Sequence, residues 1–546
     1  MKKRSTFTVL AKLIVLIRPL LGYMLLAIIL GLIGNLFATF ITLSGAFAIG
    51  KVLGKLSFSL PLLYVSIVLL AVLRAVLRYG EQSMNHFIAF KLLAEIRDQV
   101  FKALRRLAPA KLEGRDKGDL ISVITSDIEL LEVFYAHTIS PICIAVLYCT
   151  FMCIFFSKFN KTVMLVALCA YIMVGFIVPM AVNALSGNDG RIFRDASGEL
   201  SSFVLDSLRG LREVLQYHQG EKRLADTDEA TERLSTYEWN MKKKAGYNAS
   251  FTHIVILAFD LAMVYFAATT LETYQAVICV IAMMSSFGPV SALAALGSTL
   301  QNTVAAGNRV LDILEEEPIT KDINGKEETV FDDIHVEDLS FSYDADEVLS
   351  NLTLEIPKNH IVGISGKSGS GKSTLLKLIM RFWESSKGSI KIGSTSVNDI
   401  NTVNLRNMES YVTQDTHLFH DTLRNNIRIA KLDATDEEIE RACQKASVDE
   451  FIHTLPDGYD TVISELGENL SSGEKQRIGL ARSFLHDSDV ILLDEPTSNL
   501  DSLNEAIILK SLKEEKENKT IVLVSHRAST MRIVDEQYAV ENGRLS

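Results

Sequence analysis

Six long apolar stretches in the first 300 residues constrain the fold of this chain more than any other feature. They centre on residues 20–49, 59–79, 137–157, 162–183, 249–270 and 274–297. Each has about the 20 residues that an α-helix needs to cross the hydrocarbon core of a bilayer. With 48% hydrophobic residues and a mean hydropathy of +0.21 over 546 residues, the sequence predicts a multi-pass membrane protein with more than one domain.

The connections between these stretches alternate in length, and the alternation predicts their sidedness. Residues 80–136 and 184–248 are long, charged and rich in helix formers, whereas the other connections are short. We therefore expect both long segments on one side, as helical continuations of the spans. The basic N-terminus and the Lys and Arg residues of 80–136 place that side in the cytoplasm. Residues 7–23 predict an amphipathic helix on the inner membrane surface.

The pattern changes after residue 310 and divides the chain into domains. We expect an all-α transmembrane domain with six helices over residues 1–310, a linker over 311–333, and a domain of alternating strands and helices over 334–546. The linker is acidic and contains Pro318 and Gly325, which favour irregular structure. The formal net charge of −11 and the lack of a long basic run in the sequence argue against nucleic-acid binding.

The segment GKSGSGKS, from Gly366 to Ser373, fits the phosphate-loop pattern G-x-x-x-x-G-K-[ST]. The apolar run HIVGIS precedes it and the helical run TLLKLIM follows, so the loop has the strand-to-helix context that the pattern requires. Its glycines let backbone amides surround phosphates at a helix N-terminus. Lys372 is expected to reach the β and γ phosphates, and the Ser373 hydroxyl to bind Mg²⁺. The predicted nucleotide-binding residues here are Gly366, Lys367, Ser368, Gly369, Ser370, Gly371, Lys372, Ser373 and Thr374.

The segment VILLDEP, residues 490–496, is an apolar strand that ends in two carboxylates. Asp494 suits the coordination of Mg²⁺, and Glu495 is placed to polarise an attacking water as general base. Taken alone, the segment also fits a buried strand with polar end residues. The phosphate loop in the same domain favours the catalytic interpretation, an α/β P-loop nucleotide-binding domain.

These motifs and their order resemble the nucleotide-binding domain of the ATP-binding cassette (ABC) transporter family. The resemblance implies further roles in this chain. Tyr343 in LSFSYD matches the aromatic residue that stacks on adenine, and Gln414 in YVTQDTHLF matches the Q-loop residue that senses Mg²⁺ and the membrane domain. His526 in LVSHR matches the switch histidine at the γ-phosphate. Asp501 in SNLD matches the D-loop aspartate, with Asn499 where alanine is usual.

The segment LSSGE, residues 470–474, is similar to the LSGGQ signature by which this family contacts the nucleotide of a partner chain. Ser471 keeps the hydroxyl and Gly473 keeps the flexible backbone. Ser472 stands where glycine is usual, and Glu474 replaces an amide by a carboxylate, which adds negative charge near phosphate. We expect an asymmetric heterodimer in which the partner supplies the better signature; a homodimer stays an alternative.

Six spans ahead of a nucleotide domain resemble the exporter architecture, in which two half-transporters pair. Residues 114–132 and 207–223 are similar to the first and second intracellular coupling regions of such exporters. Residues 78–141 resemble the CydC half of the CydD/CydC exporters, heterodimers associated with export of cysteine or glutathione, with heme and with cytochrome bd assembly. That resemblance implies His86 as a heme ligand, although Gln82 stands where CydC has an arginine. A solvated interfacial histidine is the alternative.

Asp260 lies in the middle of the apolar segment HIVILAFDLAMVYF. A carboxylate at that depth is costly, so we expect it to face the bundle interior or a wet cavity. We expect Asp260 either to lie on a substrate pathway or to form a structural hydrogen bond to a neighbouring helix. His253, seven residues earlier, is an expected partner on nearly the same helical face.

The leading prediction is one half of an ATP-driven exporter in the cell membrane. Its nucleotide-binding domain is cytoplasmic, its ligands are ATP and Mg²⁺ with heme as a further hypothesis, and its partner is a second half-transporter. The predicted catalytic residues are Glu495, His526, Lys372 and Gln414, and the predicted Mg²⁺ ligands are Ser373, Gln414 and Asp494.

Three alternatives stay open at this point. The chain is a homodimeric lipid or drug exporter, a peptide exporter, or a regulatory subunit that binds ATP and hydrolyses little of it. Loss of Glu495 or His526 would mark the regulatory subunit, and the sequence retains both residues.

Overall fold

The computed structural model describes residues 4–545, except positions 53, 58, 116, 182–188, 295–296, 344–345, 465–466 and 468. The chain forms two compact units, one of residues 1–105 and 115–316 and the other of residues 106–114 and 317–546. Positions 182–183 and 295–296 at the ends of two predicted spans, and the N-terminal Lys2 and Lys3, lie outside the described residues.

The described part of the first unit is helical, and six of its helices are long and apolar enough to cross a membrane. They are Arg18–Val52, Leu60–Leu107, Gly118–Ser157, Lys161–Ala181, Gly220–Thr270 and Thr273–Leu293. Each of these segments covers most of one predicted span, and together they confirm the six spans. Two of them have 48 and 51 residues, so the predicted helical continuations of the spans are confirmed as well.

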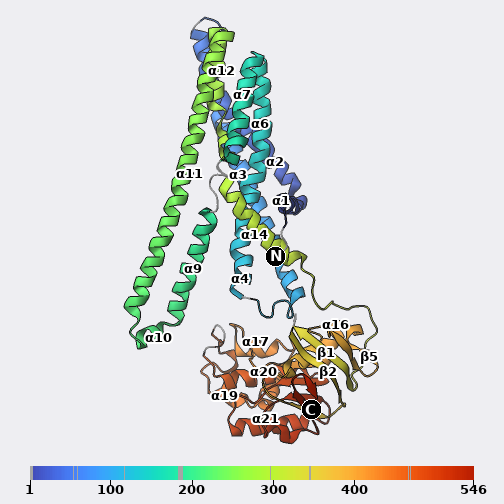
Figure 1. Ribbon diagram of the computed structural model, residues 1–546. Coiled ribbons are helices and arrows are strands. Elements are labelled where there is room, and N and C mark those ends of the chain that lie inside the picture. Colours follow the sequence, from blue (N-terminus) through green and yellow to red (C-terminus); the bar gives the residue numbers. More distant parts are fainter. Residues whose placement is uncertain are drawn as a thin grey trace. The chain divides into compact units, whose positions relative to one another are not determined.

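The α-helices of this unit are shown in Figure 1. Their bounds are α1 (Thr6–Val15), α2 (Leu21–Val52), α3 (Leu60–Leu107), α4 (Lys117–Ser122), α5 (Ile128–Phe134), α6 (Ser140–Ser157), α7 (Lys161–Ile172), α9 (Asp189–Arg209), α10 (Leu211–Gln216), α11 (Gly220–Thr270), α12 (Thr273–Ser285), α13 (Gly288–Ala294) and α14 (Gly297–Glu315). Three π-helical turns, Val123–Asp127, Tyr135–Ile139 and Met173–Ile177, continue the spans between or after these helices. A π turn places one extra residue in the helix and rotates the side chains that follow it.

Among the described residues, hydrogen bonds between hydroxyl groups join helices across the apolar core of the membrane bundle. The Thr39 and Tyr148 hydroxyls lie 2.5 Å apart and join α2 to α6. The Tyr171 hydroxyl donates to Ser286 Oγ at 2.7 Å and joins α7 to the end of α12. Buried hydroxyls need such partners, so these bonds fix the rotation of the helices against one another.

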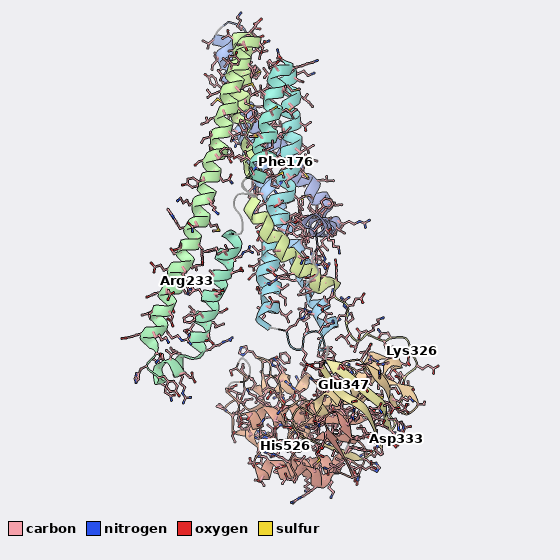
Figure 2. All side chains as sticks on the ribbon, in the orientation of Figure 1. Phe176, Arg233, Lys326, Asp333, Glu347 and His526 are labelled. Carbon is pink, nitrogen blue, oxygen red and sulfur yellow. The ribbon has the colours of Figure 1, made fainter. Side chains whose placement is uncertain are left out.

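Helices α9, α10 and α11 form an arm that extends from the bundle (Figure 1). Side chains around Arg233 project from the arm on both sides in Figure 2. Large apolar residues at its tip are exposed, including Leu208 (62%), Leu211 (48%), Leu215 (65%) and Tyr217 (66%). A soluble surface rarely carries such a group of apolar side chains without a partner to cover it.

The second unit contains two β-sheets with helices around them. Its strands are β1 (Ile334–Tyr343), β2 (Asp346–Ile356), β3 (Ile361–Ser365), β4 (Lys387–Ile392), β5 (Thr395–Ser396), β6 (Glu409–Val412), β7 (Val490–Asp494), β8 (Thr520–Val524), β9 (Glu536–Glu541) and β10 (Arg544–Leu545). Its helices are α15 (Lys372–Ile379), α16 (Thr402–Met408), α17 (Leu423–Arg428), α18 (Asp436–Lys445), α19 (Asp449–Thr454), α20 (Ser472–His486) and α21 (Ser502–Glu515).

One sheet has four strands in the antiparallel order β2-β1-β4-β5. The other has six strands in the order β10-β9-β3-β8-β7-β6, in which β9, β3, β8, β7 and β6 run parallel. Every residue of β7 and β8 is buried. This is why both strands read as continuous apolar runs, since helices cover both faces of a parallel sheet.

Two predicted boundaries differ from the structure. The N-terminal amphipathic helix ends at Val15, and a 3₁₀ turn over Arg18–Leu20 separates it from α2. Pro19 in that turn lacks the N–H that a continuous helix requires. Residues 311–315, which the sequence placed in the linker, are the last turn of α14, because Glu315 pairs with Arg4 (3.1 Å) and Lys12 (2.5 Å).

Candidate functional site

The predicted catalytic residues lie at one edge of the six-stranded sheet. The phosphate loop follows β3, Gln414 follows β6, Asp494 ends β7 and His526 follows β8. These four strands are parallel neighbours in the order β3-β8-β7-β6. Their carboxyl ends therefore meet at the same edge, where ligands bind in open α/β sheets.

Glycines set the path of the phosphate loop at two positions. Gly366 has φ +150°, and a Cβ atom there would lie 2.2 Å from the Val540 carbonyl oxygen. Gly371 has φ +99° and precedes α15 as its N-cap residue. Because glycine has no side chain to cap the helix, the first N–H groups of α15 are left for a ligand.

Two polar side chains of the loop are oriented toward its interior. The Lys372 ammonium donates to the carbonyls of Gly366 (2.9 Å) and Lys367 (2.8 Å), and Lys372 is only 6% exposed. Ser370 is also 6% exposed, and its buried hydroxyl has no hydrogen-bond partner among the described residues. A cation and a free hydroxyl inside a ring of amides fit a bound phosphate group.

A cavity of about 300 Å³ joins the loop to the ends of β6 and β7. Its lining residues are Val348, Ser368, Gly369, Gly371, Lys372, Ser373, Thr374, Gln414, Asp494 and Glu495. All but Val348 are predicted site residues from three separate segments of the sequence. The structure therefore brings the loop, the Q-loop glutamine and both carboxylates to one cavity.

The Glu495 carboxylate lies between two side chains from neighbouring strand ends. His526 Nδ1 is 3.1 Å from Glu495 Oε1, and Gln414 Nε2 donates to Glu495 Oε2 at 3.5 Å. The Glu495 backbone has φ +51°, which is unusual for a residue other than glycine. Such a conformation persists only where surrounding contacts hold it, and it occurs often at functional sites.

Asp494 is the more buried of the two carboxylates. The Tyr411 hydroxyl donates to Asp494 Oδ2 at 3.4 Å, and Ser373 also hydrogen-bonds this carboxyl. Burial raises the pKa of Asp494 above its ordinary value, and the hydrogen bond from Ser373 opposes the shift. Asp494 and Ser373 thus present two oxygen atoms to the same part of the cavity.

Tyr343 ends β1, and its hydroxyl lies 3.4 Å from Thr374 Oγ1 of the phosphate-loop helix. Its ring packs edge-on against Phe341 and Trp383, with centroids 4.8 and 5.0 Å away. The structure thus places the predicted adenine-stacking residue beside the phosphate loop.

The signature segment begins α20, and Glu474 has a structural role there. Ser471 is the N-cap residue, and its hydroxyl accepts from the Glu474 N–H at 3.4 Å. The Glu474 carboxylate accepts from the Ser471 N–H at 2.8 Å, which completes a capping box. A carboxylate at a helix N-terminus is also favoured by the helix dipole. Ser472 is exposed and has no positive φ, so a serine there causes no backbone strain.

Seven predicted nucleotide-binding residues are not among those that line the cavity. Tyr343, Gly366, Lys367 and Ser370 lie in or beside the phosphate loop, whereas Ser471, Gly473 and Asp501 lie in other segments. Ser471 and Gly473 lie at the start of α20, and Asp501 caps α21 by accepting from the N–H groups of Leu503 and Asn504, both at 3.0 Å. A Cβ atom on Gly473 would lie 2.9 Å from the Asn499 carbonyl oxygen. The signature segment and the D-loop therefore pack together, apart from the cavity residues.

In the membrane unit, His86 lies at a small polar cluster. Its Nδ1 is 3.4 Å from Glu132 Oε1, and its ring centroid is 5.8 Å from that of Phe90 and 5.4 Å from that of His137. Arg78, two turns earlier on α3, pairs with Glu81 at 2.7 Å. The structure thus surrounds His86 with ionisable and aromatic side chains.

The expected partnership between Asp260 and His253 is wrong. Asp260 is buried, and its Oδ1 has no hydrogen-bond partner in the described part of the chain. His253 is exposed, and its Nδ1 contacts the Ala249 carbonyl of its own helix at 2.8 Å. Seven residues span about 10 Å along a helix, which is too far for the two side chains to meet.

The sequence analysis missed three residues around the site. Gln476 on α20 is 1% exposed and hydrogen-bonds the Glu495 carbonyl, Tyr411 contacts Asp494, and Trp383 packs against Tyr343. Glutamine residues on helices are mostly exposed, and the residues next to Gln476 in the sequence do not indicate that it is buried. Tyr411 lies on β6, three residues before the predicted Gln414, and this spacing was the one usable signal.

Comparisons with known proteins agree with this geometry. A family model described as ABC transporter matches residues 349–498, and one described as ABC transporter transmembrane region matches residues 22–287. The chain is 45% identical over 553 residues to a Haemophilus influenzae protein named "Probable ABC transporter ATP-binding/permease protein", with 100% of both chains covered.

More distant similarities extend to two named transporters and one solved structure. The chain is 30% identical over 490 residues to the "Glutathione/L-cysteine transport system ATP-binding/permease protein CydC" of Haemophilus influenzae, covering 87% of this chain and 84% of the relative. It is 30% identical over 509 residues to the "ATP-dependent lipid A-core flippase" of Desulfotalea psychrophila, covering 89% and 86%. The "Structure of a bacterial Atm1-family ABC exporter with ATP bound" has a TM-score of 0.85 at 22% identity, over 97% and 94% of the chains, and shows the same fold.

The capping box at the signature segment predicts how Glu474 contributes to stability. Glu474→Ala removes the acceptor for the Ser471 N–H and is expected to cost about 1 kcal/mol, lowering Tm by about 2–4 °C for a domain of this size. Glu474→Gln keeps an acceptor oxygen and should leave Tm unchanged. Thermal unfolding followed by tryptophan fluorescence measures both, with Glu514→Ala on an exposed side chain of α21 as the control. Equal losses for the Ala and Gln variants would contradict the capping role.

Proposed function

The chain belongs to the ABC transporter family, as one half of an exporter that couples ATP hydrolysis to transport across the membrane. From that premise we propose which residues hydrolyse ATP, what the chain pairs with and what it moves. The observation that carries the catalytic assignment is the position of Glu495, whose carboxylate lies at the phosphate-loop cavity between Gln414 and His526.

The phosphate loop, residues 366–374, binds the triphosphate in this proposal. Its amides and the first turn of α15 surround the phosphates, and Lys372 exchanges its bonds to loop carbonyls for contacts with the β and γ phosphates. Ser370 gains the partner that its buried hydroxyl lacks among the described residues. Tyr343, beside Thr374, provides the ring for the adenine.

Ser373, Asp494 and Gln414 are the proposed ligands for Mg²⁺. A hydroxyl, a carboxylate and an amide oxygen are the hard donors that this ion prefers, and all three side chains line the same cavity. When bound, the ion neutralises charge on the transferring phosphoryl group. Because a ligand carboxylate must be ionised, the raised pKa of Asp494 makes ion binding weaken as the pH falls.

Glu495 acts as general base on the water that attacks the γ-phosphorus. Its carboxylate accepts one proton from the water as the new P–O bond forms and the bond between the γ-phosphorus and the bridging oxygen of ADP breaks. Gln414 and His526 each reach one carboxylate oxygen, so they hold the base in place. In the proposal His526, whose side chain is 62% exposed, also donates to the γ-phosphate.

A second half-transporter completes the site. Ser471 and Gly473 lie outside this chain's cavity, at the exposed N-terminus of α20, and their proposed target is the nucleotide of the partner. Tight ATP binding between two such domains stabilises the closed dimer, and this differential affinity drives the conformational change. The exposed apolar residues of the α9–α11 arm give the partner a surface to cover.

We propose that a cavity of about 390 Å³ between β6 and α20 couples closure of the two nucleotide-binding domains to the membrane helices. Tyr411, Thr413 and Arg482 contribute to its lining, and Gln414 directly follows Thr413, beyond the end of β6. Burial lowers the pKa of Arg482 to about 10, and its guanidinium is held by the Asn426 and His417 carbonyls. In the proposal the partner's counterpart of α10 docks here, so motion of the Q-loop reaches the membrane helices.

We favour a heterodimer over a homodimer because of Glu474. Its carboxylate is fixed at the start of α20, close to where the partner's γ-phosphate is expected, and two negative charges at short range repel. A homodimer would carry this charge at both of its nucleotide sites. A heterodimer confines it to one site and leaves the other with the partner's signature.

The proposed substrate is a small thiol, cysteine or glutathione. Support comes from the relative named as a glutathione/L-cysteine transport protein and from the resemblance over residues 78–141. The relative named as a lipid A-core flippase is equally identical, so lipid export by a homodimer is the second candidate. The membrane unit supplies a buried carboxylate, Asp260, whose Oδ1 is free of hydrogen bonds to described residues and suits a substrate amine.

The surroundings of His86 do not fit a heme group. Gln82 provides no cation for a heme carboxylate, and Arg78 is already paired with Glu81 at 2.7 Å. His86 Nδ1 faces Glu132 at 3.4 Å. No step of the proposed function therefore uses heme, and the cluster is assigned to the inner end of the bundle as a polar contact.

The regulatory alternative, a subunit with little hydrolysis, conflicts with the assembled site. The chain retains Glu495, and the side chains of Gln414 and His526 lie 3.5 and 3.1 Å from its carboxylate oxygens. A chain that only sensed ATP would not require this arrangement around the water position.

The first test is Glu495→Gln in the full transporter with its co-purified partner. Loss of the base is expected to lower ATP turnover about 100-fold or more, while the Kd for ATP stays within about twofold, because the phosphate loop is intact. Steady-state ATPase assays and binding of a fluorescent ATP analogue measure the two quantities. Glu514→Gln on α21 is the control for loss of a carboxylate. Turnover near the wild-type rate would refute the catalytic assignment.

The second test separates the substrate candidates in lipid nanodiscs. Reduced glutathione or cysteine should stimulate ATP turnover of the purified pair, because a transported substrate favours the closing conformation. Ophthalmic acid, which is glutathione with an ethyl side chain in place of the thiol-bearing one, is the matched control and should stimulate less. Stimulation by lipid A-core without any response to thiols would identify the lipid exporter instead.

A further inference from the structure

Gln476 contacts the catalytic segment from the signature helix. It lies on α20, four residues after the first helical residue, and is 1% exposed. Its Nε2 donates to the Glu495 carbonyl at 2.7 Å and to Ser498 Oγ at 3.4 Å. Its Oε1 accepts from the Asn499 N–H at 3.4 Å. One buried side chain thus joins the general base to the D-loop.

The backbone of Glu495 requires contacts of this kind. At φ +51° its main chain is in the left-handed region, which a glutamate adopts only when surrounding structure holds it there. Its N–H donates to the Val524 carbonyl at the end of β8, at 2.9 Å. Its carbonyl accepts from Gln476. The peptide groups of the base are therefore held by the sheet on one side and by α20 on the other.

Helix α20 contacts the D-loop at two successive points. Gly473 packs so closely on the Asn499 carbonyl that a Cβ atom would approach it to 2.9 Å, and Gln476 bonds the Asn499 N–H one turn later. Displacement of the start of α20 along or across this contact therefore moves the groups that hold Glu495.

We propose that Gln476 is a positioning residue for ATP hydrolysis, which ties the geometry of Glu495 to the position of the signature helix. This inference rests on the proposed function, in which Glu495 is this chain's base and the start of α20 meets the partner's nucleotide. Binding of the partner's nucleotide at Ser471 then fixes α20, and Gln476 transmits that placement to the Glu495 carbonyl. Through this residue, nucleotide binding at the partner's site controls the position of Glu495, and so the rate of ATP hydrolysis, at this chain's own site.

Two variants of Gln476 test the role in the full transporter with its partner. Gln476→Met keeps the length of the side chain and removes all three hydrogen bonds. Gln476→Glu keeps an acceptor for the Asn499 N–H and loses the donor to the Glu495 carbonyl. Both should lower kcat about tenfold or more and leave the KM for ATP within about twofold, because the phosphate loop is untouched. A purely structural role would not separate kcat from KM in this way.

The control removes a buried hydrogen bond of the same domain away from the site. Ser488 is 2% exposed, and its hydroxyl donates to the Val490 carbonyl at 3.0 Å. Ser488→Ala should retain kcat within about twofold, even where it lowers Tm as much as the Gln476 variants do. ATP binding by each variant confirms that its nucleotide domain is folded.

A double-mutant cycle decides whether Gln476 acts through Glu495. If it does, Gln476→Met should cause no further loss of the residual turnover in the Glu495→Gln background. Wild-type kcat in both Gln476 variants would overturn the inference, and so would an equal fractional loss with and without Glu495. Failure of the proposed function looks different, because Glu495→Gln alone would then retain full turnover.

Discussion

The parallel order of four buried strands is the constraint on which the rest of the nucleotide unit depends. β3, β8, β7 and β6 are neighbours, so their carboxyl ends share one edge of the sheet. Segments separated by more than 100 residues in the sequence therefore meet around one cavity. The strands fix the positions of the segments that follow them, and those segments carry the side chains that line the cavity, as expected for ligand sites in α/β sheets.

The structure explains locally why the signature segment differs from the usual sequence at Ser472 and Glu474. Glu474 departs from the usual glutamine, yet its carboxylate closes a capping box with Ser471 and stabilises the start of α20. Ser472 is exposed in ordinary helical geometry. Neither difference disables this chain's own cavity, to which the segment does not contribute. The cost of the added charge falls on the partner's nucleotide, which is the physical reason for expecting an asymmetric pair.

Much of the fold and of the cavity was predictable, because both rest on local patterns. The apolar stretches revealed the spans by length, and the loop around Lys372 and the carboxylates after β7 carry their own motifs. Contacts between distant segments were not predictable. The last turn of α14 depends on cations near the N-terminus, and the burial of Gln476 depends on the D-loop. His253 failed as a partner for Asp260 because a shared helical face does not bring side chains two turns apart into contact.

In the proposed dimer, each nucleotide is held by the strand-end cavity of one chain and the signature helix of the other. Vanadate photocleavage tests it directly, since vanadate trapped with Mg²⁺ and ADP at the γ-phosphate position cleaves the polypeptide at the serines beside it under ultraviolet light. We expect cleavage of this chain at two places, near Ser370 in its own phosphate loop and near Ser471 at the partner's nucleotide. Sequencing the fragments by mass spectrometry identifies both. Cleavage near Ser370 with none near Ser471 would contradict the shared site.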